Sequence, residues 1–160
     1  MDKVQLHQTI INALLVVLET SKNAAIQAHE AATNGETVAE NKFDTFSLEA
    51  SYLAAGQSKR VSESEEKINI FQQLKVQYFK PESLIRLGAL VVLEDAKNNI
   101  KTLFLSPVAG GLKVSFDQFE VTLVTPSAPL GCALMRHRLG DDITVLVGDE
   151  KQSYIVLNIV

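Results

Sequence analysis

The 160-residue sequence predicts an α+β protein, with an antiparallel coiled-coil hairpin of two α-helices over residues 1–79 and a small α+β domain over residues 80–160. Apolar residues in the first half recur at alternating spacings of three and four, which is the period of packed helices. Short β-branched stretches between turn residues fill the second half, which is the pattern of strands. Pro81 in "FKPESLIRLG" separates the two patterns, because proline disfavours helix at the residue before it.

The first helix is predicted from a row of apolar and small residues that share one face. Its members are Val4, Ile11, Leu14, Leu18, Ser21, Ala25, Ala28 and Ala32, with His7 in the position between the first two. This spacing is typical of the seam of a coiled coil. The seam residues become smaller toward Ala32, so we expect the two helices to approach each other most closely there.

The second helix carries a weaker seam that again has small residues nearest the bend. Its members are Ala50, Ala54, Gln57, Val61, Ser64, Ile68 and Phe71. The two size gradients mirror each other, as an antiparallel hairpin requires. Gly35 is placed to end the first helix, and Asp44 or Thr45 to cap the second.

The bend between the helices, "NGETVAENKFDT" at residues 34–45, is acidic: it carries Glu36, Glu40 and Asp44 against one base, Lys42. The net charge of residues 30–49 is −4, equal to that of the whole chain. Acids at an exposed bend ordinarily serve solvation and helix capping. Carboxylate oxygens are also the ligands that Mg²⁺ prefers, so the bend is a candidate supplier of metal ligands.

The second half predicts strands at "ALVVLED" and "IKTLFLS" around "AKNN", in "VSFDQFEVTLVT" after the Gly110-Gly111 break, and in a final hairpin of "ITVLVG" and "SYIVLNIV" around "GDEK". Between them, "PSAPLGCALMRHRLGDD" predicts a short helix. Ser127 is its expected N-cap, Pro129 lies in its first turn, and Gly140 ends it after a basic last turn.

Several classes of function have no support in the sequence. A single cysteine, Cys132, precludes an internal disulfide and favours a reducing compartment; we expect it in the core. The three histidines lack the spacing of a zinc site, and no phosphate loop or catalytic serine motif appears. The apolar run at residues 13–18 is too short to span a bilayer, so the sequence favours a soluble, cytoplasmic protein without membrane contact.

Two stretches resemble the bacterial GreA/GreB family of transcription elongation factors, and the resemblance follows essentially the whole chain in order. The stronger stretch, "TPSAPLGCALMRHRLGDDITVLV", is similar to a family pattern that is matched by Pro129, Leu130, Gly131, Ala133, Leu134, Gly140 and Asp141. In the bend, Gly35-Glu36 and Glu40-Asn41 stand where the family has a glycine-acid pair and a Glu-Asn pair. "KFDTFSLEASYLAAGQSKR" resembles a divergent Gre-like subgroup.

The resemblance implies a coiled coil joined to an FKBP-like domain, in a protein that binds bacterial RNA polymerase. In the family, the coiled coil enters the secondary channel and the small domain grips its rim. The rim contacts expected here are Thr125, Pro126, Ser127, Pro129, Leu130 and Gly131. The protein would be a monomer and no enzyme itself, with only indirect contact to nascent RNA.

The implied chemistry is cleavage of backtracked RNA by the polymerase, with a second Mg²⁺ shared between the two proteins and no cofactor bound by this chain alone. Glu40 is the expected metal ligand, Glu36 supports the metal or its water, and Asp44 has a secondary, orienting role. Glu36 replaces the usual aspartate of the family, and one extra residue precedes the Glu-Asn pair.

Two other functions stay open at this point. Because the bend departs from the family pattern, the protein could bind the same channel as a regulator without stimulating cleavage. An FKBP-like domain also suggests a peptidyl-prolyl isomerase or a chaperone as an alternative function, although fold does not confer activity. Few aromatic residues are present there to line a proline pocket: Phe104, Phe116, Phe119 and Tyr154.

Overall fold

The computed structural model describes residues 2–33 and 45–160. It confirms the α+β class: two long helices are followed by a mixed sheet with one short helix. The chain forms two compact units, a helical unit of residues 11–69 and a sheet unit of residues 1–10 and 70–160. The sheet unit therefore includes the first turns of one long helix and the last turn of the other.

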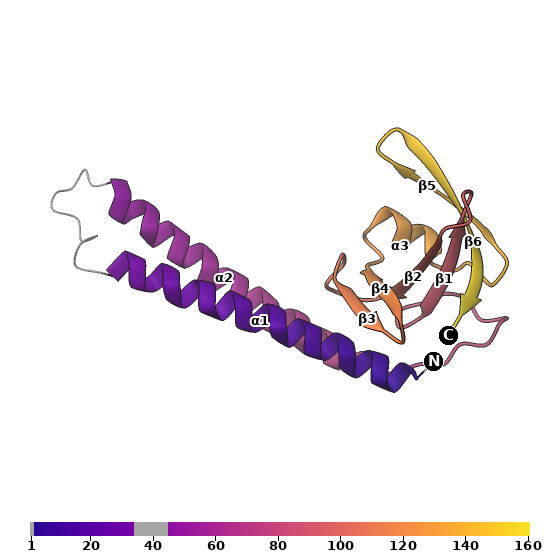
Figure 1. Cartoon of the computed structure of the whole chain (residues 1–160), viewed down its shortest axis with the longest axis horizontal. Helices are drawn as coiled ribbons and strands as arrows, with labels where there is room; N and C mark the ends of the chain where they lie inside the picture. Colours follow the sequence, from indigo (N-terminus) through magenta and orange to yellow (C-terminus); the bar gives the residue numbers. More distant parts are fainter. Residues whose placement is uncertain (1, 34–44) are drawn as a thin grey trace. The chain divides into compact units, whose positions relative to one another are not determined.

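The helical unit consists of most of α1 (Lys3–Thr33) and α2 (Thr45–Gln72), which run antiparallel beside each other (Figure 1). An ion pair between Lys22 Nζ of α1 and Glu65 Oε1 of α2, at 3.3 Å, links them across their surface. The predicted helix end at Gly35 and the predicted cap at Asp44 lie outside the described residues.

The predicted seam is confirmed within this unit. From residue 51 to residue 69, the residues that are not exposed are Ala54, Gln57, Val61, Ser64 and Ile68. On α1, the seam residues from Ile11 to Ala28 are all buried or half-buried. The burial pattern therefore has the period of a coiled coil.

The seam prediction is wrong at Val4, whose side chain is 57% exposed. The first turns of α1 belong to the sheet unit, and there Lys3, Leu6 and Ile10 are the buried residues of the helix. Asp2 supports this first turn, because its Oδ1 accepts hydrogen bonds from the backbone N–H groups of Val4 and Gln5, at 2.9 and 3.2 Å.

The sheet unit contains one six-stranded sheet in the order β3-β4-β2-β1-β6-β5. The strands are β1 (Leu90–Asp95), β2 (Ile100–Leu105), β3 (Lys113–Phe116), β4 (Phe119–Val124), β5 (Asp142–Val147) and β6 (Glu150–Ile159). Neighbouring strands are antiparallel except β2 and β4, which are parallel. The β3 strand and the loop before it form the connection that such a parallel pair needs.

The predicted strands are confirmed, with one division that the sequence did not indicate. The stretch "VSFDQFEVTLVT" forms two strands, β3 and β4, joined at Asp117 and Gln118, whose φ values are 47° and 69°. Two residues with left-handed backbone conformation make a tight hairpin turn. In a sequence, such a turn is usually recognised by Asn or Gly at these positions. The final hairpin instead has Gly148, at φ 63°, in its turn.

Both faces of the sheet are covered. On one face, α3 (Pro129–Leu134) contributes Leu134 to a core cluster with the strand residues Leu93, Leu103 and Val156; we call this the α3 face. On the opposite face, Phe104 of β2 lies against Phe71 at the end of α2, with ring centroids 6.0 Å apart. His7 stacks on the other side of Phe71 at 4.6 Å.

Lys3 anchors α1 in the sheet unit. It is a charged residue that is nevertheless buried, at 3% exposure. Its Nζ donates hydrogen bonds to the backbone carbonyls of Gly88 and Val160, both at 2.7 Å, and to that of Gln77. The same ammonium lies 4.7 Å from the centre of the Phe79 ring. Burial lowers the pKa of Lys3 to about 8.

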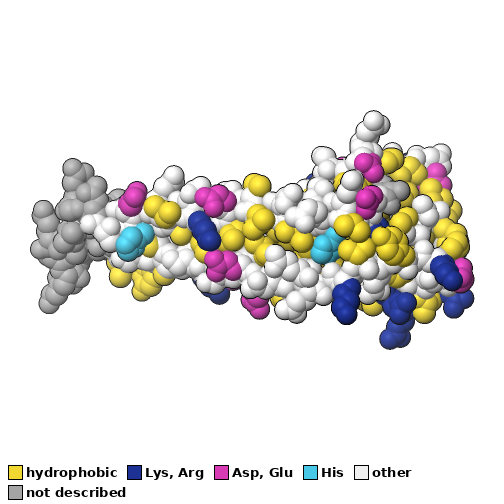
Figure 2. Space-filling view, turned by 90° about the horizontal axis from the view of Figure 1, so that it is seen from below, with side chains coloured by type: hydrophobic (Ala, Val, Ile, Leu, Met, Phe, Trp, Pro, Cys, Tyr) yellow, Lys and Arg dark blue, Asp and Glu magenta, His cyan; other side chains and the backbone are white. Residues whose placement is uncertain are grey.

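The helix α1 has a length and hydropathy that a membrane span could also have. The stretch Lys3–Ala31 reaches a mean hydropathy of 1.2, whereas the prediction considered only the run at residues 13–18. One such helix is weak evidence of a membrane span, because core helices of soluble proteins and signal sequences can have the same length and hydropathy. Figure 2 shows apolar side chains at the surface along the helices. On α1, the exposed apolar residues include Leu15, Val16 and Val17.

Candidate functional site

The predicted metal ligands Glu36, Glu40 and Asp44 lie outside the described residues, so their geometry stays a prediction. Within residues 2–33 and 45–160, no group of three or more His, Cys, Asp and Glu side chains could hold a metal ion. The donor set of the bend is nevertheless of the right kind for Mg²⁺, because carboxylates are hard oxygen ligands.

The six predicted contact residues lie close together in the chain, three in the turn after β4 and three in the first residues of α3. Thr125 opens a tight turn, in which its carbonyl accepts a hydrogen bond from the Ala128 N–H at 2.9 Å. The hydroxyls of Thr125 and Ser127 lie 2.9 Å apart and share a hydrogen bond. We call residues 125–131 the β4–α3 connection.

Gly131 is the residue that allows this connection to close. A Cβ at this position would lie 2.0 Å from the Thr125 carbonyl oxygen, far inside any van der Waals contact. On another side, a Cβ at Gly110 would lie 3.2 Å from Thr125 Cγ2. Thr125 is thus held between two glycines, and Gly110, which the sequence indicated only as part of a turn, packs against the candidate site.

The surface of the connection is formed by Ser127 and Pro129, which are exposed. Thr125, Pro126 and Leu130 are half-buried beside them, and Gly131 is buried. A partner protein would therefore touch Ser127 and Pro129 first. Gly131 would act on such a contact through the position of Thr125.

The local predictions for α3 are correct for Pro129 and wrong for the N-cap and for the end of the helix. Pro129 does occupy the first turn, but the N-cap is Ala128, without a side-chain cap, and not Ser127. The helix ends at Leu134, before the predicted basic last turn. Beyond it, Arg136 N–H donates to the Ile85 carbonyl and Ile85 N–H donates to the His137 carbonyl, at 3.1 and 2.9 Å.

This exchange of hydrogen bonds with Ile85 explains the short helix, because the chain from Arg136 onward satisfies its backbone outside α3. It also explains the position of Cys132, which is exposed and not in the core. In so short a helix only Gly131 and Leu134 are buried, and Cys132 lies off that side.

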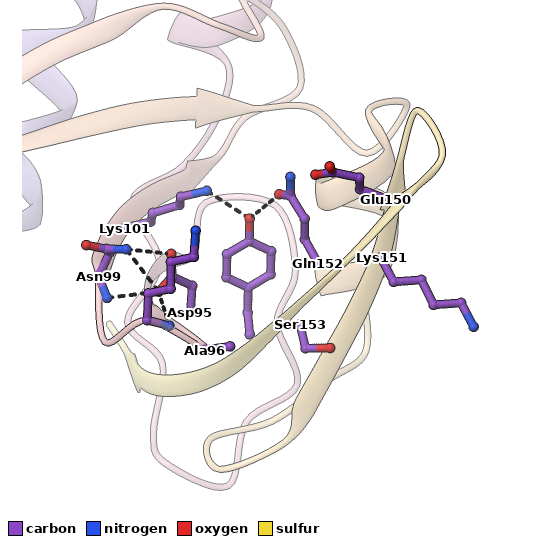
Figure 3. A pocket seen from close by; sticks show the side chains of 10 residues that line it. Asp95, Ala96, Asn99, Lys101, Glu150, Lys151, Gln152 and Ser153 are labelled. Atoms are coloured by element: carbon purple, nitrogen blue, oxygen red, sulfur yellow. Dashed lines mark hydrogen bonds between the residues drawn. The ribbon is translucent and has the colours of Figure 1, made fainter.

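A polar pocket of about 340 Å³ lies at the other end of the α3 face, where the β1–β2 turn meets β6 (Figure 3). Lys101 Nζ donates to the Tyr154 hydroxyl at 2.8 Å, and that hydroxyl donates to Gln152 Oε1 at 2.7 Å. The Asn99 side chain and the backbone N–H groups of Asn99 and Lys97 hydrogen-bond Asp95, which lowers the pKa of that carboxyl. This pocket could not be predicted from the sequence, because its members come from two distant stretches, residues 95–101 and 150–154.

Comparisons with known proteins give structural neighbours but no sequence match. No protein-family model matches the sequence, and no characterised protein matches it significantly.

Three of the structural neighbours are structures of Gfh1. GreA factor homolog 1 (Gfh1) of Thermus thermophilus is 20% identical, with 94% of each chain covered and a TM-score of 0.40. A structure described as that of the transcription factor Gfh1 is 18% identical, with 93% of this chain and 92% of that chain covered and a TM-score of 0.41. Thermus aquaticus Gfh1 is 19% identical, with 91% and 90% covered and a TM-score of 0.39. Scores at this level do not assign the chain to a family.

Proposed function

We propose that this chain is a Gre-type transcription elongation factor that binds bacterial RNA polymerase and stimulates cleavage of backtracked RNA. The observation that carries the proposal is the β4–α3 connection. Three of the seven residues that resemble the family pattern, Pro129, Leu130 and Gly131, lie there, and this glycine is required by its contact with the Thr125 carbonyl. The other half of the chain is an antiparallel helical hairpin with an acidic bend, the second feature that the resemblance predicts.

In this proposal the sheet unit binds the polymerase and the helical hairpin supplies the metal ligands. Exposed Ser127 and Pro129 in the sheet unit contact the rim of the polymerase channel. The helical hairpin brings its bend to the active site, where Glu40 ligates and Glu36 supports a Mg²⁺ ion shared with the polymerase. Such an ion, when bound, activates water and stabilises the leaving oxygen. The chain needs no nucleophile of its own, because it supplies only carboxylate oxygens.

A cleavage assay on a stalled, backtracked polymerase tests the chemistry. Glu40→Gln keeps the size of the side chain and removes its charge, so cleavage should slow by at least about tenfold, as expected when a metal site is disturbed. Glu30→Gln, on an exposed position of α1, is the matched control and should cleave at the wild-type rate. Equal rates for wild type and Glu40→Gln would refute the assignment.

The second candidate, a channel regulator without cleavage activity, is favoured by the bend itself. Glu36 is longer than the usual aspartate and an extra residue separates it from Glu40, so the carboxylates could be displaced from a metal-binding arrangement. The same assay separates the two functions. A wild-type chain that binds the polymerase but leaves backtracked RNA intact would support the regulator.

A further inference from the structure

We propose that the chain associates weakly with a second copy of itself, by antiparallel pairing of β5 with β5 of that copy. The two six-stranded sheets would then join into one continuous sheet. The resemblance to the GreA/GreB family implies a monomer, so this dimer goes beyond it. The inference does not depend on the proposed function, because the free edge belongs to β5 and not to the β4–α3 connection.

The two edge strands of the sheet, β3 and β5, differ in how they are protected from pairing. The β3 strand has four residues and carries Lys113, and both short length and lysine protect an edge. The β5 strand has six residues, and only Asp142, at its start, is charged. Leu146 and Val147 near its end are 59% and 50% exposed. An apolar edge strand without lysine, proline or bulge is a template for another strand.

The end of the β5–β6 hairpin is a ribbon of only two strands. The β6 strand pairs with β5 from Glu150 to Ile155, but with β1 only from Tyr154 onward. In the described part of the chain, residues 144–147 of β5 and 150–153 of β6 therefore have no third strand beside them, and Figure 1 shows the hairpin extending past β1. A two-stranded hairpin is marginally stable in water, so a strand added at β5 would stabilise it.

The hydrogen bonds between β5 and β6 determine which backbone groups of β5 are free. The Val156 N–H donates to the Asp141 carbonyl at 3.0 Å, just before β5 begins. Hydrogen-bonded pairs alternate with other pairs along antiparallel strands, so the odd-numbered residues of β5 bond to β6. The N–H and C=O groups of Thr144 and Leu146 therefore point to the free edge.

A second copy of β5 offers these free groups the complementary set. When Val145 lies opposite Val145 of the other copy, Thr144 lies opposite Leu146, and Leu146 lies opposite Thr144. Each of these two pairs exchanges both of its backbone hydrogen bonds across a two-fold axis. Asp142, the one charged residue of β5, then lies opposite Gly148 of the other copy and not opposite a like charge. The strand is thus complementary to itself in register and in charge.

The size of the contact indicates a weak dimer. Pairing of two six-residue strands covers the edge and the exposed side chains of Leu146 and Val147, but leaves the two faces of each sheet largely unchanged. Such a contact is smaller than the about 1,200 Å² at the lower limit of stable interfaces. We therefore expect a dissociation constant of about 100 µM.

The test uses the full chain, studied by analytical ultracentrifugation between about 10 µM and about 1 mM. We expect the average mass to rise across this range from that of one chain toward that of two. Over the same range, hydrogen exchange of the Thr144 and Leu146 amides should slow at least about threefold, because these amides bond to the second copy. The Val145 amide bonds to β6 and should exchange at a rate independent of concentration.

Leu146→Lys places a lysine on the free edge and removes an apolar contact, twice in each dimer. It should weaken association at least about tenfold. Leu157→Lys is the matched control, because Leu157 is also exposed, at 42%, but lies on β6 between two other strands. This variant should associate like the wild type.

Thr144→Pro removes one N–H that points to the free edge, a position at which edge strands tolerate proline. It should also weaken association at least about tenfold, because each copy loses a hydrogen bond to the other. Ser115→Pro is the matched control on the opposite edge. The Leu123 N–H donates to the Leu112 carbonyl at 2.8 Å, so the even-numbered residues of β3 bond to β4 and the Ser115 N–H points outward.

An unchanged amide spectrum of the sheet unit outside the substituted strand establishes that each variant is folded. The mass of a single chain at every concentration would overturn the proposal and leave the edge to a strand of a different protein. A Thr144 amide whose exchange does not depend on concentration would overturn it too. So would a dimer that survives both Leu146→Lys and Thr144→Pro, or one that Leu157→Lys or Ser115→Pro abolishes.

Discussion

Gly131 fills a role that depends on a single missing atom. Its Cα approaches the Thr125 carbonyl so closely that any side chain would collide with backbone, which cannot move aside as a flexible side chain can. The collision involves the residue that opens the β4–α3 connection. The glycine of the motif is therefore explained by packing, before any partner is considered.

We expect Gly131→Ala to destabilise the sheet unit by about 3 kcal/mol, the cost of an overpacked core position. Gly56→Ala is the control, because Gly56 lies inside α2 and no atom lies within 4 Å of the position that its Cβ would take. Alanine there should stabilise the helix by about 1 kcal/mol. Denaturant unfolding, followed by the amide signals of each unit, measures both. A neutral Gly131→Ala would contradict the close contact.

Lys3 makes stability depend on pH in an unusual direction. Its pKa in the folded chain is about 8, against an ordinary value of 10.5 for an exposed lysine. Between these values the unfolded chain carries the proton and the folded chain does not. The unfolded state binds more protons there, so the free energy of unfolding should rise with pH, by up to about 3 kcal/mol from this group.

The variant Lys3→Met isolates this contribution, since it removes the titrating group. We expect the wild type to gain stability relative to Lys3→Met as pH rises from about 7.5 to about 10. Lys80→Met, at an exposed position, should keep the wild-type slope. Thermal unfolding across this range is the measurement, and parallel curves for the wild type and Lys3→Met would contradict the lowered pKa.

At the scale of elements, the coiled-coil seam predicts that neighbouring residues of α1 contribute very differently to the free energy of unfolding. Leu14 is 4% exposed in the seam, whereas Leu15, the next residue of α1, is 45% exposed. Leu14→Ala should destabilise the helical unit by about 3 kcal/mol, since it leaves a cavity between the helices. Leu15→Ala should cost less than about 1 kcal/mol. Helical circular dichroism during thermal unfolding compares the two, and equal losses would mean that the seam is misplaced.

The seam could be predicted because helix periodicity is a property of nearby residues. The prediction failed at Val4, where the buried side of α1 is set by the sheet unit and not by α2. The end of α3 failed for a similar reason, since hydrogen bonds with Ile85, about fifty residues away, draw the chain out of the helix. The turn at Asp117 and Gln118 was not predicted, because it contains neither glycine nor asparagine.

At the scale of the whole molecule, the sequence predicted the order of the helices and strands better than the contacts between distant segments of the chain. The β4–α3 connection was found by its residues, but its contact with Gly110 depends on a loop outside the matched stretch. The polar pocket of Figure 3 could not be found, because it depends on which strands are neighbours. Patterns among nearby residues predict the helices and strands. The pairing of strands, which such patterns do not give, decides which side chains meet at a site.

The proposed function requires two activities that the chain should perform separately: binding through the sheet unit and metal ligation through the bend. A variant with Glu36→Gln, Glu40→Gln and Asp44→Asn keeps the size of these side chains and removes their charge. It should bind the polymerase as tightly as the wild type and, in excess, block wild-type cleavage of backtracked RNA. Adding Ser127→Lys, which places a long charged side chain on the exposed contact surface, should relieve the block.

Fluorescence anisotropy of the labelled chain measures binding, and a gel of the RNA ends measures cleavage. If Ser127→Lys leaves the block intact, the polymerase contact lies elsewhere on the chain, whatever the bend does. If the uncharged bend abolishes binding, its carboxylates serve attachment and not the shared metal. Only loss of cleavage with binding retained, and loss of binding on adding Ser127→Lys, fits a factor whose two ends have separate tasks.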